Sequence, residues 1–200
     1  MVEAGDAALD LESRGQARRQ RILEAAAACF AREGFHGASI ARIAKEAGMS
    51  AGNLYHFFAS KEAIIAALVQ RRLDQALAHF TQIEDREDLF QAMLDRVEVS
   101  LREQTDLDRA ALELEILAEA ARNPAVAAIV QTADAAMRER FRRLYRAARQ
   151  ARGLPLKDEA AAVEVLTALF QGLPVRAVSH PDLDQAGLVP MLRLALGTFC

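Results

Sequence analysis

The sequence predicts an all-α fold. Long runs rich in Ala, Leu, Glu and Arg favour helix over strand, and apolar residues recur three or four positions apart along most of the chain. Ten glycines and five prolines in 200 residues are too few for a disordered or fibrous protein. With 52% hydrophobic residues, the chain is long enough for one sizeable core, or for a small domain joined to a larger one.

Three helices are predicted first. Apolar residues repeat at helical spacing in a helix that has arginines at its entrance and Gly34 placed to end it: Ile22, Leu23, Ala26, Ala27 and Phe30. Ser39 can cap a second helix of about two turns, which ends at Gly48. Ser50 can cap a third helix, predicted to run through Phe57.

The second and third helices form a helix-turn-helix pattern. Gly48 can supply the positive φ of the tight turn between them. Leu54 and Phe58 are four positions apart and are expected to point inward. The outer faces of the third helix are therefore predicted to carry Ala51, Gly52, Asn53, Tyr55 and His56.

A long fourth helix is predicted to begin after Ser60 and to join two domains. We expect a flexible arm over residues 1–14, a helix-turn-helix domain over 15–62 and a larger helical domain over 63–200. Between Ser13 and Arg72 ten Lys or Arg face four acidic residues, although the whole chain carries −3. A basic first part on an acidic remainder indicates that the first part meets a polyanion, although a solvated charged face gives the same count.

Further amphipathic helices are predicted in the larger domain. They run near Leu89–Leu101, over Leu107–Ala121, over about Pro124–Gln150, from Asp158 past Phe170, and after SHPDLD to the end of the chain. Gly172 can permit close helix approach, and Pro174 and Pro190 are expected to kink or end the last helices.

The small residues Ala51 and Gly52 suit a helix whose front approaches a surface closely, such as the major groove of DNA. Asn53 could pair with an adenine edge, while Tyr55, His56 and Lys61 could reach phosphates. Arginines before the first helix, Arg18 among them, could add backbone or minor-groove contacts.

The stretch IAKEAGMSAGNLYHFFASKE resembles the IA..AG.S.G.LY..F.SKE pattern of the TetR family of transcriptional regulators. The resemblance implies a homodimer, two recognition helices on a palindromic operator, and a carboxy-terminal helical domain that binds an effector and is closed by a dimer-forming pair of helices. It also implies phosphate contacts from Ser39 and Tyr55 and base contacts from Ala51, Gly52 and Asn53. Lys61 matches the lysine that opens the family's fourth helix. Ser50 and His56 complete the DNA-binding set that we expect. One departure concerns the histidine that many members carry directly before the phenylalanine matched by Phe58. Here Phe57 occupies that place, His56 precedes it, and Phe57 is expected to turn inward.

Aromatic and apolar residues of the larger domain are candidates for an effector pocket, although such stripes are more often core: Phe80, Phe90, Met93, Val97, Leu117, Met137, Phe141 and Tyr145. In LELEILAEAA, Glu115 and Glu119 share a helix face and could hold a cationic ligand. The favoured interpretation is that Glu113, Glu115 and Glu119 are solvated or paired with Arg122 and its neighbours.

The densely basic segment MRERFRRLYRAARQAR is interpreted as a solvated helix rather than a second nucleic-acid surface. Its inward stripe is predicted to be Met137, Phe141, Leu144 and Ala148, and Glu139 can pair with Arg143.

No other class of protein fits the pattern as well. Neither Cys29 nor Cys200 has a partner pattern for metal or a disulfide, and Cys29 is interpreted as packing. The histidines are scattered and no catalytic motif is present, so we expect no enzyme, no cofactor and no metal. No secretion signal and no uninterrupted apolar run of about 18 residues is found, which predicts a cytoplasmic protein without a membrane partner.

The function expected is that of a ligand-responsive repressor, which binds operator DNA as a homodimer and is released by a small-molecule effector. The alternative is a helix-turn-helix regulator whose second domain serves only dimerisation or a protein partner.

Overall fold

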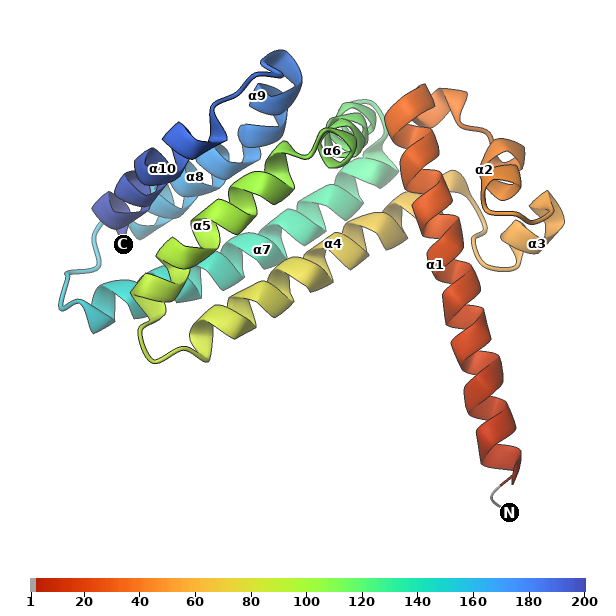
Figure 1. Ribbon diagram of the computed structural model, residues 1–200, viewed down its shortest axis with the longest axis horizontal. Helices are drawn as coiled ribbons and strands as arrows, with labels where there is room; N and C mark the ends of the chain where they lie inside the picture. The colour runs from red at the N-terminus through yellow and green to blue at the C-terminus, as the bar shows by residue number, and fades with distance from the viewer. Residues whose placement is uncertain (1–2) are drawn as a thin grey trace. The chain divides into compact units, whose positions relative to one another are not determined.

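A computed structural model describes the backbone of residues 3–200 and the side chains from Ser13 onward. All regular elements of this part of the chain are helices, which confirms the all-α prediction (Figure 1). The chain divides into two compact units, one ending at Leu68 and the other spanning Val69–Cys200. The boundary falls inside the helix α4 (Lys61–Glu84), the element expected to join two domains.

The first unit contains α1 (Glu3–Gly37), α2 (Ile40–Glu46), α3 (Ala51–Tyr55) and the start of α4. Residues 3–14, expected as a flexible arm, are helical and continuous with α1 because Ala, Leu and Glu dominate the segment and no proline interrupts it. Met1 and Val2 of the expected arm lie outside the described residues. Gly34 interrupts α1 with φ 73° and ψ 167°, a backbone conformation that glycine adopts readily.

The core of the first unit is assembled from all four helices. Side chains that are at most 4% exposed come from α1 (Ile22, Phe30), α2 (Ile43), α3 and the turn after it (Leu54, Phe58) and α4 (Ile64, Ile65). Cys29 is fully buried among them, as its apolar setting predicted, and burial raises the pKa of its thiol. A helix as short as α3 is held in place by this shared core, because isolated helices of this length are not stable in water.

The second unit continues α4 and adds six helices: α5 (Leu89–Thr105), α6 (Leu107–Ala120), α7 (Pro124–Ala151), α8 (Glu159–Gln171), α9 (Leu173–Ser179) and α10 (Gln185–Phe199). Close packing joins α5 to α9 and α10, α6 to α7 and α9, and α7 to α8. Asp88, Asp106 and Asn123 each cap the helix that follows, with the side-chain oxygen accepting a backbone N–H.

One apolar core joins the helices of the second unit. Val97, Leu101, Leu144, Leu166 and Leu196 are among its members, each at most 3% exposed. The inward stripe predicted for α7 is confirmed, because Leu144 and Ala148 are buried and Phe141 packs against the cluster. Met137 is half-buried on the same face.

The carboxy-terminal region forms three helices where two were expected. The chain leaves α8 at Gln171, turns at Gly172 and begins α9 with Pro174 in the first turn, where a missing N–H costs no hydrogen bond. Pro190 lies inside α10, which continues through it. By length and composition alone the segment Glu159–Ser179 could cross a membrane, a weak signal that core helices also give, and the structure divides it into α8 and α9.

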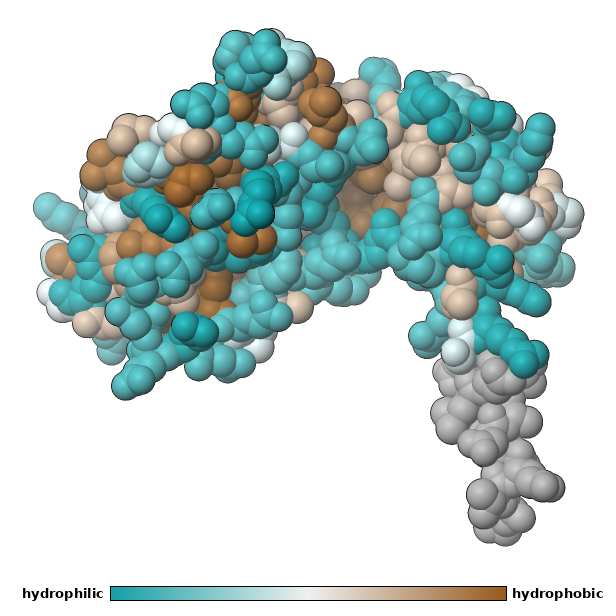
Figure 2. All heavy atoms as spheres, viewed as in Figure 1, coloured by the Kyte–Doolittle hydropathy of each residue, from teal (hydrophilic) through white to brown (hydrophobic). Residues whose placement is uncertain are grey.

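The last three helices expose large apolar side chains. Each helix carries a pair spaced three or four positions apart and 38–64% exposed: Val165 and Leu169 on α8, Val175 and Val178 on α9, and Met191 and Leu194 on α10. Figure 2 shows apolar residues reaching the surface over α8 and α10. Large contiguous apolar patches are unusual on the surface of a monomer.

Candidate nucleic-acid interface and effector site

The α2–α3 segment has the geometry of a helix-turn-helix. Gly48 has φ +69°, as expected for the residue that turns the chain between the two helices. The backbone N–H of Met49 donates to the carbonyl of Ala44 at 2.9 Å, and that of Gly48 donates to the carbonyl of Lys45 at 3.1 Å. These bonds satisfy the last carbonyls of α2 and fix the direction in which α3 leaves.

One side of α3 is fixed in the core and the other faces outward. Leu54 is fully buried and Phe58 is 4% exposed, as their spacing predicted. Gly52, Tyr55 and His56 are exposed, whereas Ala51, Asn53 and Phe57 are half-buried. Tyr55 exposes 55% of its surface, which places a large aromatic side chain with a hydroxyl group on the outer face.

Gly52 is not required by packing within the protein. A methyl group built on it would meet no atom within 4 Å, and its φ is not in the left-handed region. The space in front of this position is therefore open, and the glycine adds no side chain to it. This is the arrangement expected if the backbone of α3 approaches an external surface closely.

The two serines of the predicted interface are helix caps. Ser39 Oγ accepts the backbone N–H of Arg42 at 3.1 Å, and Ser50 Oγ accepts that of Asn53 at 3.2 Å. Both serines are exposed. Because each hydroxyl serves here as an acceptor, its O–H can still be donated to a phosphate oxygen.

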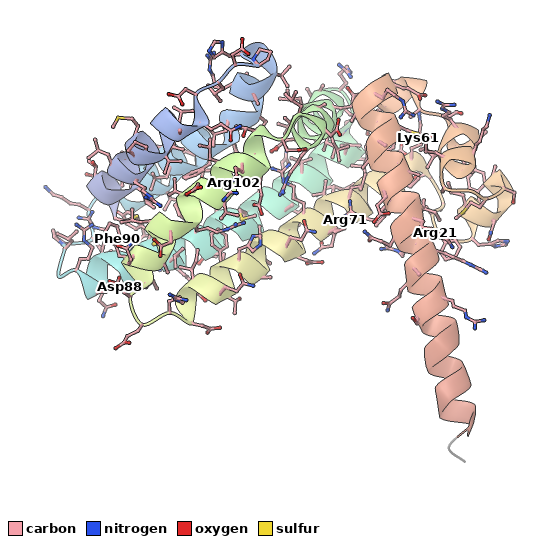
Figure 3. All side chains as sticks on the ribbon, viewed as in Figure 1. Arg21, Lys61, Arg71, Asp88, Phe90 and Arg102 are labelled. Carbon is pink, nitrogen blue, oxygen red and sulfur yellow. The ribbon has the colours of Figure 1, made fainter. Side chains whose placement is uncertain are left out.

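Lys61 has a partner within the first unit. Its Nζ donates to the carbonyl of Phe35 at 2.6 Å and lies 4.4 Å from the centre of the Phe35 ring (Figure 3). The ammonium group therefore ties the start of α4 to the end of α1, and it has two further N–H groups for a phosphate. Arg18 is exposed along α1, and its neighbour Arg19 lies over the ring of Phe58 at 4.8 Å.

Six of the eight predicted effector residues belong to the apolar core of the second unit or pack against it. Met93, Val97 and Tyr145 belong to the core, and Phe80, Phe90 and Phe141 pack against it. The rings of Phe80 and Phe141 stack with their centres 6.2 Å apart. Leu117, by contrast, is 45% exposed, and Met137 is half-buried.

A recess of about 250 Å³ opens between α7, α8 and α10 and shares only Tyr145 with the predicted set. Arg149, Lys157 and Phe199 are among the residues that line it. The hydroxyl of Tyr145 donates to the carbonyl of Lys157 at 3.1 Å, and Arg149 Nε donates to the carbonyl of Pro155 at 2.8 Å. These polar groups bind the protein's own backbone.

Two acidic residues of α6 are paired: Glu119 with the expected Arg122, and Glu113 with Arg72 of α4. Glu119 is 2% exposed, accepts from Asn123 Nδ2 at 3.0 Å and lies 3.7 Å from Arg122 Nη2. Glu113 lies 2.5 Å from Arg72 Nη2. On α7 the expected partner was wrong: Glu139 accepts from Arg142, three positions on, instead of Arg143.

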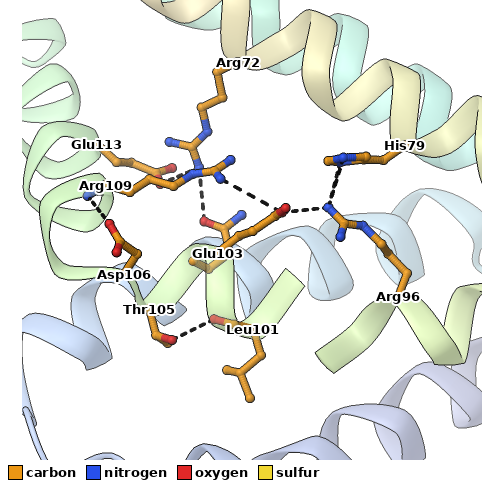
Figure 4. A network of polar contacts seen from close by, with 10 residues as sticks. Arg72, His79, Arg96, Leu101, Glu103, Thr105, Asp106, Arg109 and Glu113 are labelled. Carbon is orange, nitrogen blue, oxygen red and sulfur yellow. Dashed lines mark hydrogen bonds and ion pairs between the residues drawn. The ribbon is translucent and has the colours of Figure 1, made fainter. Parts of the chain in front are cut away.

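A cluster of charged and polar side chains joins α4, α5 and α6 (Figure 4). We call it the arginine cluster, and it comprises Arg72, His79, Arg96, Glu103, Gln104, Arg109 and Glu113. Arg96 Nη2 lies 2.7 Å from His79 Nδ1 and donates to Glu103 Oε2 at 2.7 Å. Arg72 Nη2 donates to Gln104 Oε1 at 3.1 Å, so long side chains of α4 reach both neighbouring helices.

The electrostatics of the arginine cluster follow from burial and from the excess of cations. Burial, assisted by the guanidinium of Arg96, lowers the pKa of His79. Burial and the neighbouring Arg72 likewise lower the pKa of Arg109, whose nearest approach to Glu103 is 4.0 Å. His79 is neutral in this arrangement, because a guanidinium only donates and Nδ1 must therefore accept.

The cations of this cluster were not among the residues predicted from the sequence. A signal exists in their spacing, since Arg72 and His79 are seven apart, as are Arg96 and Glu103, so each pair returns to one helix face. Nothing in the local pattern brings the three helices together, however, and the cluster is visible only in the tertiary structure.

Two family models match the chain. One, described as "Bacterial regulatory proteins, tetR family", covers residues 22–68. The other, described as "BetI-type transcriptional repressor, C-terminal", covers residues 86–200, more than half of the chain. The first coincides with the helix-turn-helix unit and the second with the larger helical unit.

Individual proteins give the same result. The HTH-type transcriptional regulator UidR of Escherichia coli strain K12 is 39% identical over 122 residues, which span 61% of this chain and 61% of UidR, less than two thirds of its length. The structure of Salmonella enterica GusR is 32% identical, with a TM-score of 0.78 over 92% of this chain and 95% of GusR. A Saccharomonospora viridis transcriptional regulator, solved in complex with choline, has a TM-score of 0.72 and 24% identity over 92% of this chain and 95% of its own. The chain belongs to the TetR family of transcriptional regulators, with a helix-turn-helix DNA-binding domain at its amino terminus.

Proposed function

We propose that this regulator is a cytoplasmic repressor that binds a palindromic operator as a homodimer and leaves it when a small molecule binds the second unit. The outer face of α3 carries the proposal. Its glycine leaves the backbone open to close approach, and Asn53, Tyr55 and His56 surround that opening with polar groups. Base edges would be read by Asn53, and phosphates would be bound by Tyr55, Ser39, Ser50 and Lys61.

The exposed apolar pairs on α8, α9 and α10 support the homodimer. A second copy of the chain would cover the same pairs through a two-fold axis, and a palindromic operator presents two half-sites with the same symmetry. Leu194, at 64% exposed, and Met191, at 57%, have the most apolar surface to gain from burial.

Release by an effector needs only a modest difference in free energy. A ligand that favours the DNA-incompetent state by about 1.4 kcal/mol lowers operator affinity tenfold. Support comes from the relative solved with choline, which shows that a protein of this fold accommodates a small molecule. The predicted apolar residues around Phe80 and Phe141 are the proposed walls on one side of the site.

The experiment that tests the proposal is a selection of bound duplexes from a random pool at fixed moderate salt, with Asn53→Ala as the matched variant. Moderate salt suppresses non-specific binding to phosphates. We expect a palindrome with half-sites about one helical turn apart, and an altered base preference for the variant. A pool without any enriched sequence would contradict specific operator binding.

The second candidate, a second unit that serves only dimerisation or a protein partner, rests on the packing of the predicted effector residues into the core. Thermal melting distinguishes the two, because a ligand that binds the folded state raises the melting temperature with its concentration. A protein that ignores a broad panel of small molecules while retaining operator binding would support the second candidate.

A further inference from the structure

We propose that the arginine cluster is the site of a monoanionic effector, an organic carboxylate that binds Arg109 with support from Arg72. The inference rests on the proposed function, since it names the chemical class of the ligand that the second unit would bind. It goes further in placing the charge-binding groups on α4, α5 and α6, away from the recess between α7, α8 and α10.

The charges of the cluster do not balance. Three guanidinium groups, on Arg72, Arg96 and Arg109, face the two carboxylates of Glu103 and Glu113, and His79 is neutral. Asp106, at the start of α6, is exposed and its Oδ1 accepts the backbone N–H of Arg109. One positive charge is therefore left over in a partly buried place, where an uncompensated charge is costly.

Arg109 carries this surplus. Arg72 is paired with Glu113 at 2.5 Å and Arg96 with Glu103 at 2.7 Å, but the guanidinium of Arg109 comes no closer than 4.0 Å to Glu103. No hydrogen bond from that guanidinium to another described side chain is present. Its side chain keeps 33% of its surface, so that an incoming ligand can reach it.

The geometry favours a planar carboxylate. A guanidinium offers two parallel N–H groups that match the two oxygens of a carboxylate, and the pair is stronger than a neutral hydrogen bond. Gln104 adds a neutral donor, because its Oε1 is used by Arg72 and its amide N–H groups are left to donate. A dianion such as phosphate would bring a second charge against Glu103 and Glu113, so a monoanion matches the surplus better.

At the arginine cluster, the contacts of α4 are made by side chains. Within the described residues α4 is not among the helices whose backbones pack closely, and Arg72 and His79 reach α5 and α6 through long side chains. One residue beyond His79 on α4, Phe80 stacks on Phe141 of α7, and an organic acid long enough to reach these rings would meet an apolar surface. A ligand that replaces these bridging contacts would change how α4 is held.

The test is thermal melting of the full-length protein without DNA at pH 7.5 and constant ionic strength. The probes are acetate, hexanoate, benzoate and phenylacetate, each compared with its primary amide, together with inorganic phosphate and sodium chloride. We expect at least one carboxylate to raise the melting temperature in a concentration-dependent way, and its amide and phosphate to give smaller shifts. An amide that stabilises as well as its acid, a larger effect of phosphate, or no carboxylate effect beyond that of sodium chloride would overturn the proposal.

Four variants locate the effect. Arg109→Gln should abolish the carboxylate shift, and without ligand it should melt no lower than the parent because the surplus charge is gone. Arg109→Lys keeps the positive charge but lacks the two parallel N–H groups of the guanidinium. It should bind the acid at least about tenfold more weakly. The control Arg102→Gln alters an exposed arginine of α5 that pairs with Glu98 and should respond like the parent (Figure 3). A full response in Arg109→Gln would refute the assignment.

Glu103→Gln should bind the acid more tightly than the parent protein. Removal of one carboxylate increases the positive surplus, and tighter binding of the acid cannot result from misfolding. Weaker binding by this variant would contradict the charge argument. Operator release by the same acid is measured separately. If the acid stabilises the protein without releasing the operator, the anion site stands and its role as the effector site is rejected. If only an uncharged ligand releases the operator, the proposed function stands and the anion site is rejected.

Discussion

At the residue scale, Gly52 allows the requirements of folding and of DNA binding to be tested separately. A methyl group there meets no protein atom within 4 Å, and alanine is favoured over glycine inside a helix by about 1 kcal/mol. Gly52→Ala should therefore leave the free energy of unfolding unchanged or slightly higher. If α3 enters the major groove, the same methyl group should weaken operator binding by about tenfold or more. Urea denaturation and DNA titration measure the two effects. Unchanged DNA affinity would refute the close approach of the start of α3 to DNA.

Asn53 and Tyr55 test the division between base and phosphate contacts. Asn53→Ala should cost about 1–3 kcal/mol on the preferred operator and little on others, because an amide reads a base edge. Tyr55→Phe should weaken binding to every sequence to a similar extent, because a phosphate carries no sequence information. Titrations with the operator and with duplexes altered one base pair at a time provide the comparison. If Asn53→Ala lowered the affinity for every DNA sequence equally, Asn53 would not be a base-contacting residue.

At the scale of elements, the turn between α2 and α3 depends on one backbone conformation. Gly48 has φ +69°, which costs a residue with a side chain about 1–2 kcal/mol. Gly48→Ala should lower the free energy of unfolding of the first unit by this amount, although its methyl group also meets no atom within 4 Å. Gly52→Ala serves as the matched control, because it adds the same group at a position without this strain. Equal stability of the two variants in urea would show that the turn tolerates the change.

The contact between α4 and α5 should respond to pH through His79. Its pKa is lowered in the folded protein by burial and by Arg96, and Arg109 acts in the same direction while Glu103 opposes them. The unfolded chain therefore binds more protons between the lowered pKa and about 6.5, so stability should fall as the pH decreases through that window. His79→Gln retains an acceptor for Arg96 and does not titrate. Between pH 7.5 and 5.5 the free energy of unfolding, measured by urea denaturation, should fall less for this variant than for the parent. An equal fall in both proteins would disprove the role of His79.

At the scale of the whole molecule, the exposed apolar helix faces predict association. Leu194→Glu places a charge on the most exposed of these side chains and should shift the protein from dimer to monomer in sedimentation or light scattering. Operator affinity should fall with it, because two reading heads would no longer bind as one unit. Leu156→Glu, at a 55% exposed leucine between α7 and α8, is the control that should leave the dimer intact. A dimer that survives Leu194→Glu would show that another surface joins the copies.

The first unit was more predictable from the sequence than the second. In the first unit, the caps at Ser39 and Ser50, the turn at Gly48 and the inward Leu54 and Phe58 were all readable, because each depends on residues at most four positions apart. The helix at residues 3–14 was not expected, since this segment was interpreted as a flexible arm. In the last region Pro174 indicated a break, but not that a separate helix would follow it.

The sequence by itself determined the all-α fold, the helix-turn-helix and the outward position of Gly52 and Tyr55, because helix periodicity, capping and glycine conformation act over one or two turns of chain. Only the tertiary structure decided that Arg72, Arg96 and Arg109 would meet around two glutamates and a neutral His79. These residues lie on three helices, and their mutual distances depend on how the whole apolar core packs. Electrostatic balance is a property of groups gathered in space, and no local pattern in the chain encodes it.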